Sequence, residues 1–308
     1  MRPNSINLVQ SIHQKLLNIR RESDEDFQFL LIRYSLERFL YRLSKSSYAS
    51  QFILKGAFLF SVWTDKRYRP TKDLDLLGFG ESSPNRLKEV FREICNTVVD
   101  PDGLIFNTES IAISEIREEQ DYEGHRIKLI SSLGKARIPL QIDIAFGDAV
   151  TPQVEEHNFP SLLKMPSPRI RTYPKETVVA EKLQSMIRLG MQNSRMKDFF
   201  DLFWLSRLFI FEGSILLEAI RSTFQRRKTS IPTELPLALK DEFSTDNAKQ
   251  TQWKAFLKKN EISGMSEDFA DIITKLRDFL APPLKAASSG NSFPLVWSPG
   301  GVWQPKIN

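Results

Sequence analysis

The chain has very few residues of the kinds that form disulfide bonds or bind soft metals. Among its 308 residues it has one cysteine, Cys95, and three histidines. A lone cysteine cannot form a disulfide within the chain, and the lack of a second thiol disfavours a cysteine-based zinc site. Cys95 lies among apolar residues at helical spacing, so we interpret it as a core residue.

Long apolar segments are also missing. The first ten residues contain no apolar core of signal-peptide length. No uninterrupted run approaches the ~20 apolar residues that a membrane-spanning helix needs. The sequence therefore predicts a cytoplasmic protein without a membrane partner.

The overall composition is that of an ordinary globular protein. Hydrophobic residues make up 41% and charged residues 26% of the chain, which argues against disorder over most of its length. The formal net charge of +5 is compatible with a polyanionic partner but does not identify one. The length favours two lobes over one core, and we place their boundary within a proline-rich crossing, giving residues 1–165 and 166–308.

Apolar periodicity predicts an α+β first lobe and a mainly helical second lobe. In the first lobe, a small mixed sheet is expected to follow helices 5–18 and 24–44. Its later strands are expected at 104–106, 111–116, 125–133 and 136–146, with Gly134-Lys135 as a hairpin turn. In the second lobe we expect helices at 176–189, 194–211, 214–228 and 266–280. Pro282-Pro283 is expected to end the last helix, and the aromatic residues of the tail predict that the tail docks.

The stretch 52–80 has the first chemical motif. A short apolar run ends at Lys55-Gly56, and Ala57–Trp63 has the composition of a short buried helix. A strand, a glycine turn and a helix start leave unpaired backbone N–H groups, which favour a phosphate.

The following strand carries two aspartates. Thr71, Asp73 and Asp75 alternate with leucines, so both carboxylates are expected on one face of the sheet. Two such like charges repel each other, and Mg2+ would relieve the repulsion while leaving positions open for triphosphate oxygens. The alternative is an exposed strand end with two solvated aspartates. The preceding Lys55-Gly56 turn, where a phosphate is expected, favours the metal-binding interpretation.

Two further places in the chain have charged residues that need an explanation. Asp143 lies in the apolar strand LQIDIAF, where a charge is costly unless it is paired or bound to metal, whereas Asp148 is interpreted as a loop residue. The other place is a predicted helix-to-helix turn, whose alternative interpretation is a solvated turn with pairs four residues apart. Its charged residues are Lys182, Arg195, Lys197, Asp198 and Asp201.

Together these motifs resemble the AbiEii family of nucleotidyltransferase toxins, which includes the MenT-type toxins. In chain order they are Lys55-Gly56, Arg69-Pro70-Thr71-Lys72-Asp73-Leu74-Asp75, Gln141-Ile142-Asp143, Glu181-Lys182 and Arg195-x-Lys197-Asp198-x-x-Asp201. The resemblance implies a DNA polymerase β-like nucleotidyltransferase lobe followed by a helical lobe. The polymerase β-like superfamily usually has Gly-Ser in the first motif, whereas this chain has Lys55-Gly56, a form that also occurs in the toxin family.

The resemblance also implies roles for these residues. Asp73 and Asp75 would bind Mg2+, and Asp143 would complete the metal set or act as base. Lys182 and Asp198 match the catalytic lysine and aspartate of the family's second lobe, although the sequence leaves open whether Asp198 or Asp201 is the active one. The residues expected to bind the nucleotide are Lys55, Gly56, Arg69, Thr71, Lys182 and Arg195.

By the same resemblance, the chain would be the toxin of a bacterial toxin–antitoxin or phage-defence pair with a cognate antitoxin. It would transfer nucleotides from an NTP to the 3′ end of tRNA. The basic groups at 226–228 and 254–259 would then bind RNA or form a solvated face. The alternatives are transfer to a protein hydroxyl or a small molecule, and a non-catalytic nucleotide- or RNA-binding module.

Overall fold

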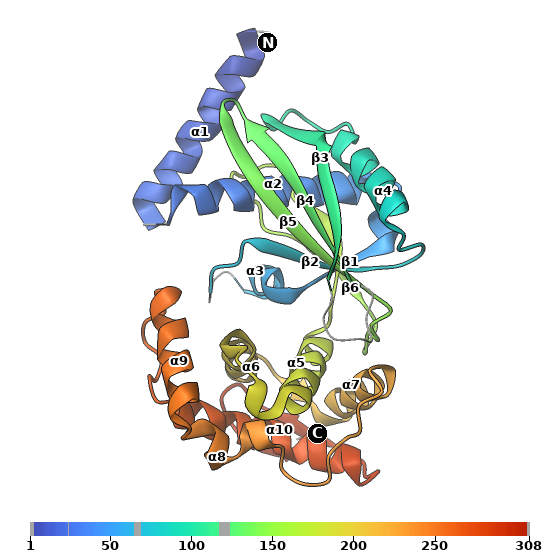
Figure 1. Cartoon of the computed structure of the whole chain (residues 1–308), viewed down its shortest axis with the longest axis vertical. Coiled ribbons are helices and arrows are strands. Elements are labelled where there is room, and N and C mark those ends of the chain that lie inside the picture. Colours follow the sequence, from blue (N-terminus) through green and yellow to red (C-terminus); the bar gives the residue numbers. More distant parts are fainter. Residues whose placement is uncertain (1–2, 24, 65–68, 117–123, 307–308) are drawn as a thin grey trace. The chain divides into compact units, whose positions relative to one another are not determined.

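The chain folds as two compact units (Figure 1). The computed structural model describes residues 3–23, 25–64, 69–116 and 124–306. Unit 1 comprises Met1–Arg67, Thr71–Gly147 and Glu155–Thr172. Unit 2 comprises Tyr68–Pro70, Asp148–Val154 and Tyr173–Asn308.

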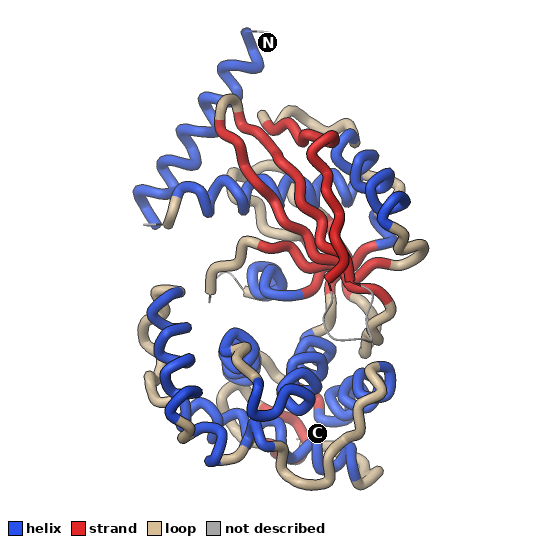
Figure 2. The backbone as a smooth tube through the Cα atoms, in the orientation of Figure 1, coloured by secondary structure: helices blue, strands red, loops and turns tan. Residues whose placement is uncertain are grey.

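Unit 1 contains one twisted sheet with helices against it (Figure 2). Its helices are α1 (Pro3–Ser23), α2 (Phe27–Lys45), α3 (Leu59–Trp63), α4 (Pro84–Asn96) and the short 3-10 turns η1 (Ala49–Gln51) and η2 (Gly56–Phe58). Its strands are β1 (Phe52–Lys55), β2 (Asp73–Gly78), β3 (Leu104–Ile116), β4 (Gly124–Leu133), β5 (Ala136–Phe146), β6 (Glu155–Asn158) and β7 (Arg169–Thr172).

The sheet is mixed, as the sequence predicts, and it has seven strands in the order β3-β4-β5-β2-β1-β7-β6. β2 runs parallel to β5 and β1 runs parallel to β7, while the other neighbours are antiparallel. The predicted hairpin is present, because β4 and β5 are joined by Gly134-Lys135, with Gly134 at φ +61°. The predicted α+β fold class is therefore confirmed.

Helices α2 and α4 cover the apolar face of this sheet. Leu74, Leu76 and Ile142 are buried there, since side chains along a strand point alternately to the two faces. Helix α2 begins at Phe27, because the side chain of Asp26 accepts a hydrogen bond from the Phe29 N–H at 2.9 Å.

The sequence predicts two strands, at 104–106 and 111–116, where the structure has the single strand β3. It runs without a break from Leu104 to Ile116, with a shift in its pairing to β4 between Asn107 and Ala112. Side chains bond the backbone groups that the shift leaves unpaired. The Ser110 hydroxyl donates to the Asn107 carbonyl at 2.6 Å and accepts from the Ile130 N–H at 2.9 Å.

Unit 2 is mainly helical. Its helices are α5 (Lys175–Leu189), α6 (Met196–Leu208), α7 (Gly213–Arg226), α8 (Asp241–Ser244), α9 (Asn247–Lys259), α10 (Phe269–Ser288) and the short turns η3 (Gly190–Gln192) and η4 (Leu237–Leu239). A three-stranded sheet in the order β10-β9-β8 consists of β8 (Phe211–Glu212), β9 (Leu295–Trp297) and β10 (Trp303–Pro305). The core is aromatic, with Phe199, Phe243 and Trp253 fully buried. No helix in the described ranges combines the length and the hydropathy that crossing a membrane requires.

The prediction that Pro282-Pro283 ends the last helix is wrong. Helix α10 continues through both prolines to Ser288. Pro283 has no N–H to donate to the carbonyl of Phe279, one helical turn earlier. The Trp303 indole N–H donates to that carbonyl at 2.9 Å instead, so a residue distant in sequence replaces the missing hydrogen bond.

The tail docks on unit 2, as its aromatic residues predict. β9 pairs with both β8 and β10, and the Trp297 indole N–H donates to the Ser206 carbonyl at 2.6 Å. The rings of Trp303 and Phe279 stack with centroids 6.0 Å apart.

We expect Trp303→Phe to lower the free energy of unfolding by about 1–3 kcal/mol, because it keeps a ring but leaves the Phe279 carbonyl without its donor. Urea denaturation measures this change. Val302→Ala, at an exposed neighbouring position, serves as the control and should change stability far less. Equal effects of the two substitutions would show that the indole bond does not stabilise α10.

Candidate active site

Four charged side chains stand opposite one another on adjacent strands of unit 1. In the strand register, Lys55 on β1 faces Asp75 on β2, Asp75 faces Asp143 on β5, and Asp143 faces Arg126 on β4. Residues opposite each other on neighbouring strands project to the same face. Lys55, Asp75, Asp143 and Arg126 thus form what we call the charged row.

Asp73 lies on the same face as the charged row. It precedes Asp75 by two residues on β2 and stands opposite Gln141 on β5. Asp73 and Asp75 are partly exposed, whereas the leucine between them and the one after them are buried. The alternation therefore brings both carboxylates to the face that is opposite α2 and α4.

Arg126 holds Asp143 from the far end of the charged row. Its Nε and Nη2 donate to the two carboxylate oxygens at 2.9 and 2.8 Å, which is a bidentate pair. This pair supplies the partner that a charge in so apolar a strand requires. The hydrogen bonds to Asp143, together with the charges of Asp143, Asp73 and Asp75, raise the pKa of Arg126 above its ordinary value.

The Lys55-Gly56 turn touches the carboxylate of Asp75. Gly56 has φ +73°, a conformation that favours glycine. A Cβ atom added at Gly56 would lie 2.0 Å from Oδ2 of Asp75. Only glycine therefore lets the turn backbone and this carboxylate approach so closely.

The acidic residues of this face have the chemistry that Mg2+ prefers. In the described parts of the chain, no three carboxylate, imidazole or thiol groups are placed together as a metal-binding cluster. Mg2+ is usually held by one or two carboxylates together with substrate phosphates and water, so Asp73 and Asp75 are a sufficient protein donor set. Asp143 keeps further lone pairs beside its bidentate pair.

Thr71 and Arg69 precede this strand in the chain. The Thr71 hydroxyl donates to the backbone carbonyl of Asp73 at 3.3 Å, within unit 1. Arg69 belongs to unit 2, where its Nε and Nη2 donate to the carboxylate of Asp201 at 2.7 and 2.9 Å.

The predicted helix-to-helix cluster of unit 2 forms a chain of alternating charges. Lys182 Nζ lies 2.7 Å from Asp198 Oδ1 and 2.8 Å from Asp201 Oδ2. Arg69 pairs with the outer side of Asp201, and Arg195 Nε lies 2.8 Å from Asp198 Oδ2. We call Arg69, Asp201, Lys182, Asp198 and Arg195 the buried ion chain.

Burial sets the electrostatics of the buried ion chain. Both aspartates are almost fully buried, which by itself raises their pKa values, but the neighbouring cations more than offset this. Arg69 and Lys182 bring the pKa of Asp201 to about 2, and Lys182 and Arg195 hold the pKa of Asp198 below its ordinary value. Burial lowers the pKa of Lys182, yet the two carboxylates raise it above its ordinary value. All three groups are therefore charged at neutral pH.

The interpretation of this cluster as a solvated turn is thus wrong for its aspartates, although Lys197 is exposed as that interpretation expects. Sequence reasoning also missed a second buried group. Asp148 lies in a loop, as predicted, but its side chain is buried and pairs with Arg227 at 3.0 Å. Arg227, which also lies 3.3 Å from Glu181, is mostly buried and so is not part of a solvated basic face.

The sequence did contain a signal for Arg126. If Gly134-Lys135 is a two-residue hairpin turn, Leu133 must face Ala136, and counting outward along both strands places Arg126 opposite Asp143. No comparable count predicts the pair of Arg227 and Asp148, because no hairpin joins them.

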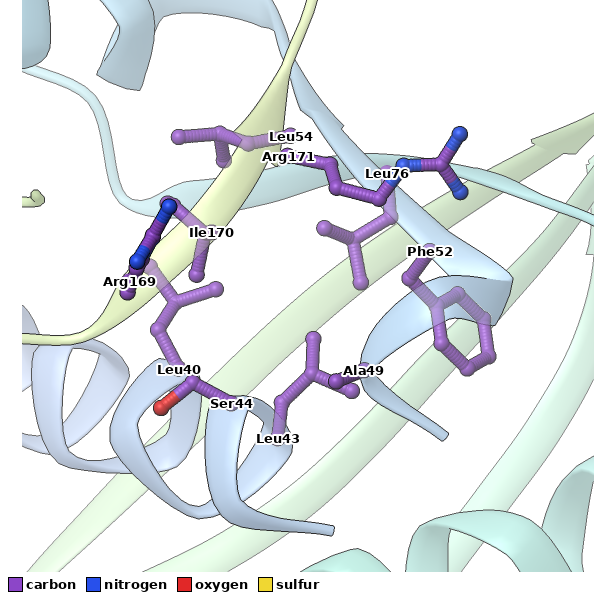
Figure 3. Close-up of a pocket in the computed structure, with 10 residues that line it drawn as sticks. All are labelled: Leu40, Leu43, Ser44, Ala49, Phe52, Leu54, Leu76, Arg169, Ile170 and Arg171. Carbon is purple, nitrogen blue, oxygen red and sulfur yellow. The ribbon is translucent and has the colours of Figure 1, made fainter. Parts of the chain in front are cut away.

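The cavity in Figure 3 is separate from the charged row. Leu40 of α2 and Leu54 and Leu76 of the sheet line it, with Arg169 and Arg171 also at its wall. It therefore lies on the apolar, helix-covered face, and none of its lining residues is among the predicted site residues.

One protein family and two solved structures match the chain. The family model described as "Nucleotidyl transferase AbiEii toxin, Type IV TA system" matches residues 38–275. The crystal structure of JHP933 from Helicobacter pylori is similar with a TM-score of 0.51 and 16% identity, covering 85% of this chain and 96% of that one. A "putative nucleotidyltransferase" from H. pylori is similar with a TM-score of 0.50 and 15% identity, covering 86% and 98%. At these identities the two structures show a shared fold. No curated protein matches the chain.

We expect Gly56→Ala to destabilise the protein more than Gly80→Ala does. Both glycines have positive φ, but a Cβ atom at Gly80 meets nothing within 4 Å, whereas at Gly56 it meets the Asp75 carboxylate. Gly80→Ala should cost about 1–2 kcal/mol for its backbone conformation alone. Gly56→Ala should cost about 1–3 kcal/mol more. Urea denaturation compares the two, and equal costs would argue against the close approach to Asp75.

We expect Asp201→Asn to lower the free energy of unfolding by about 3–5 kcal/mol at pH 7, because it removes the buried carboxylate that pairs with Arg69 and one of the two that pair with Lys182. The folded pKa of Asp201, about 2, lies below the unfolded value of about 3.9. Its ionised form therefore stabilises the fold fully above about pH 4, and this contribution is lost as the pH falls toward 2.

The stability gap between wild type and Asp201→Asn should accordingly narrow as urea denaturation is repeated from pH 7 down to pH 3. Asp241→Asn, at an exposed aspartate of the same unit, is the control and should show a much smaller gap at pH 7. A gap for Asp201→Asn that is the same at every pH would contradict the ion-pair explanation.

Proposed function

The chain belongs to the AbiEii family of nucleotidyl transferase toxins of type IV toxin–antitoxin systems, and from this membership we propose that it is an Mg2+-dependent enzyme that transfers nucleotides from an NTP to the 3′ end of tRNA. The family match confirms the resemblance that the motifs indicated. A nucleotidyltransferase of this family implies an antitoxin partner. The tRNA acceptor and the metal are our proposal.

The observation that supports the proposal best is the charged row with Asp73 beside it. Asp73 and Asp75 come from one strand, and Asp143 comes from the parallel neighbour, yet all three stand on one face of the sheet. Nucleotidyl transfer needs such a place, because negative charge grows on an α-phosphate while a hydroxyl loses its proton. A module that only binds RNA has no use for three carboxylates on one face.

The residues of unit 1 divide these tasks. Asp143 would accept the proton of the acceptor hydroxyl, or help to hold the metal. Lys55 and the backbone N–H of Gly56 would bind the terminal phosphates of the NTP. The Thr71 hydroxyl would turn from the Asp73 carbonyl to a phosphate oxygen.

Asp73 and Asp75 are the residues that would hold Mg2+. When bound there, Mg2+ supplies positive charge to the phosphates and favours the ionised acceptor hydroxyl. Gly56 keeps the Asp75 carboxylate against the turn backbone, so the metal ligand and the proposed phosphate-binding turn lie next to each other.

For unit 2 we propose the roles that the family resemblance implies. Lys182 and Asp198 would take part in catalysis, and Lys182, Arg69 and Arg195 would bind the nucleotide. The buried ion chain gives each of these residues a fixed charged partner. Asp198 and Asp201 are each buried between two cations, and we propose Asp198 as the active aspartate because it matches the family's second-lobe aspartate.

In the cell this activity would make the protein a MenT-like toxin. Nucleotides added to the tRNA 3′ end would block aminoacylation, and a cognate antitoxin would restrain the toxin until phage infection. Because NTP and tRNA meet in the cytoplasm, the proposal locates the activity there.

The test is to incubate the purified protein with Mg2+, total tRNA and each α-labelled NTP in turn. Label should enter the tRNA fraction with at least one NTP, should be lost with RNase, and should not appear in EDTA. Label that follows protease-sensitive material instead would replace tRNA by a protein acceptor. Absence of label from every acceptor in a cell lysate would rule out the transferase.

We expect Asp73→Asn to reduce the labelling rate by about 100-fold or more, because it removes a proposed metal ligand while keeping the shape of the side chain. Asp100→Asn, an exposed loop substitution in the same unit, should label tRNA at the wild-type rate. If Asp73→Asn and Asp100→Asn label tRNA equally fast, Asp73 has no part in the reaction.

A further inference from the structure

Arg126 lies outside every motif by which the sequence resembles its family, yet it ends the charged row. The row begins at Lys55 on β1 and passes through the carboxylates of Asp75 and Asp143 to Arg126 on β4. Each end of the row is therefore a cation, and the carboxylates lie between them. A strand spacing of about 4.8 Å separates neighbours, so the backbone positions of Lys55 and Arg126 are about 14 Å apart.

The Arg126 guanidinium has N–H donors that its pair with Asp143 does not use. A guanidinium has five N–H groups, and the bidentate pair with Asp143 uses one on Nε and one on Nη2. Among the residues that the structure describes, Asp143 is its only hydrogen-bond partner. The side chain is 39% exposed, compared with 18% for Asp143, so the unused N–H groups can be reached from solvent.

The order of residues in the charged row indicates which phosphate the remaining N–H groups of Arg126 would bind. In the proposed reaction the terminal phosphates of the NTP bind at the Lys55-Gly56 end, and the acceptor hydroxyl meets Asp143. With the NTP on the Lys55 side of Asp143, the RNA acceptor would approach Asp143 from the opposite side. Arg126 lies on that side.

Building on the proposed function, we propose that Arg126 binds a backbone phosphate of the acceptor RNA next to its 3′-hydroxyl. Arginine suits this task, because its planar fork can bind a carboxylate along one edge and offer its remaining donors to a phosphate. The pair with Asp143 holds the guanidinium in one orientation before RNA arrives. Arg126 thus aligns the acceptor beside the residue proposed to receive its proton.

The competing explanation is an ordinary cross-strand ion pair, which contributes little to stability and nothing to substrate binding. The two explanations differ in what they predict for RNA affinity, for its salt dependence and for nucleotide affinity.

The experiment compares Arg126→Gln with Lys128→Gln. Lys128 is on the same strand and face, two residues further along and opposite Gln141, and it is exposed, so it controls for the loss of one positive charge. Total tRNA is the RNA probe, in filter binding with Mg2+ at several KCl concentrations. Calorimetry measures the affinity for each NTP with Mg2+.

For Arg126→Gln we expect tRNA binding weakened about tenfold at low salt, with a slope of log affinity against log salt that is shallower by about 0.7. The affinity for Mg2+ and NTP should stay within about twofold of wild type. Arg126→Lys should keep the salt slope and recover only part of the affinity, because it retains the charge and loses the fork. Lys128→Gln should resemble wild type in all these measurements.

A double-mutant cycle with Asp143→Asn removes an ambiguity. Arg126→Gln removes the cation that pairs with the Asp143 carboxylate, and that negative charge by itself would repel RNA. In the Asp143→Asn background this repulsion is absent. If Arg126 binds RNA directly, Arg126→Gln still weakens tRNA binding about tenfold there; if it acts only by neutralising Asp143, the effect disappears and the inference fails. The melting temperature of each variant shows that the compared proteins are folded.

Two failures remain distinguishable. If wild type labels tRNA but Arg126→Gln binds tRNA like Lys128→Gln, the proposed function stands and the role of Arg126 is refuted. The role is also refuted if Arg126→Gln weakens NTP binding as much as tRNA binding. If wild type neither labels nor binds tRNA, both the proposed function and the role of Arg126 are refuted.

Discussion

The register between β1, β2 and β5 is the constraint on which the rest of unit 1 depends. It sets Asp75 opposite Asp143, an arrangement of like charges that is unfavourable without nearby cations. Lys55 and Arg126 stand at the two ends of the row and supply those cations. A slip of one residue would turn the carboxylates into the apolar core and bring leucines to the open face. Gly56 belongs to the same constraint, because any side chain there would collide with the Asp75 carboxylate.

Unit 2 also contains like charges close together, here in its interior. Two buried aspartates are expensive to remove from water, and the cost is offset by placing a cation on each side of both. Lys182 is shared by Asp198 and Asp201, so the loss of either aspartate changes the charge balance around it. Arg195, at the N-cap of α6, and Asp198 and Asp201 within it recur every three residues, so this helix brings all three side chains to one side.

The elements that could be predicted are those specified by local patterns. Alternation of Asp73, Leu74 and Asp75 predicted a strand with its carboxylates on one face, and helical spacing predicted α5, which carries Lys182, and α6, which carries Asp198. The predictions that failed were those in which a local rule was overridden from a distance. Proline normally ends a helix, but α10 continues because an indole 20 residues beyond Pro283 bonds the carbonyl that the proline leaves unpaired.

By itself, the sequence determined the fold class, the family motifs and the faces on which the charged side chains lie, because all three follow from the spacing of residue types along the chain. Only the tertiary structure decided which charges meet. It paired Arg227 with Asp148 and Arg69 with Asp201, whereas the pair of Arg126 and Asp143 follows from the hairpin register. The physical reason is that electrostatic energy depends on distance in space and on burial, and both are fixed only when strands and helices that are far apart in the chain have packed together.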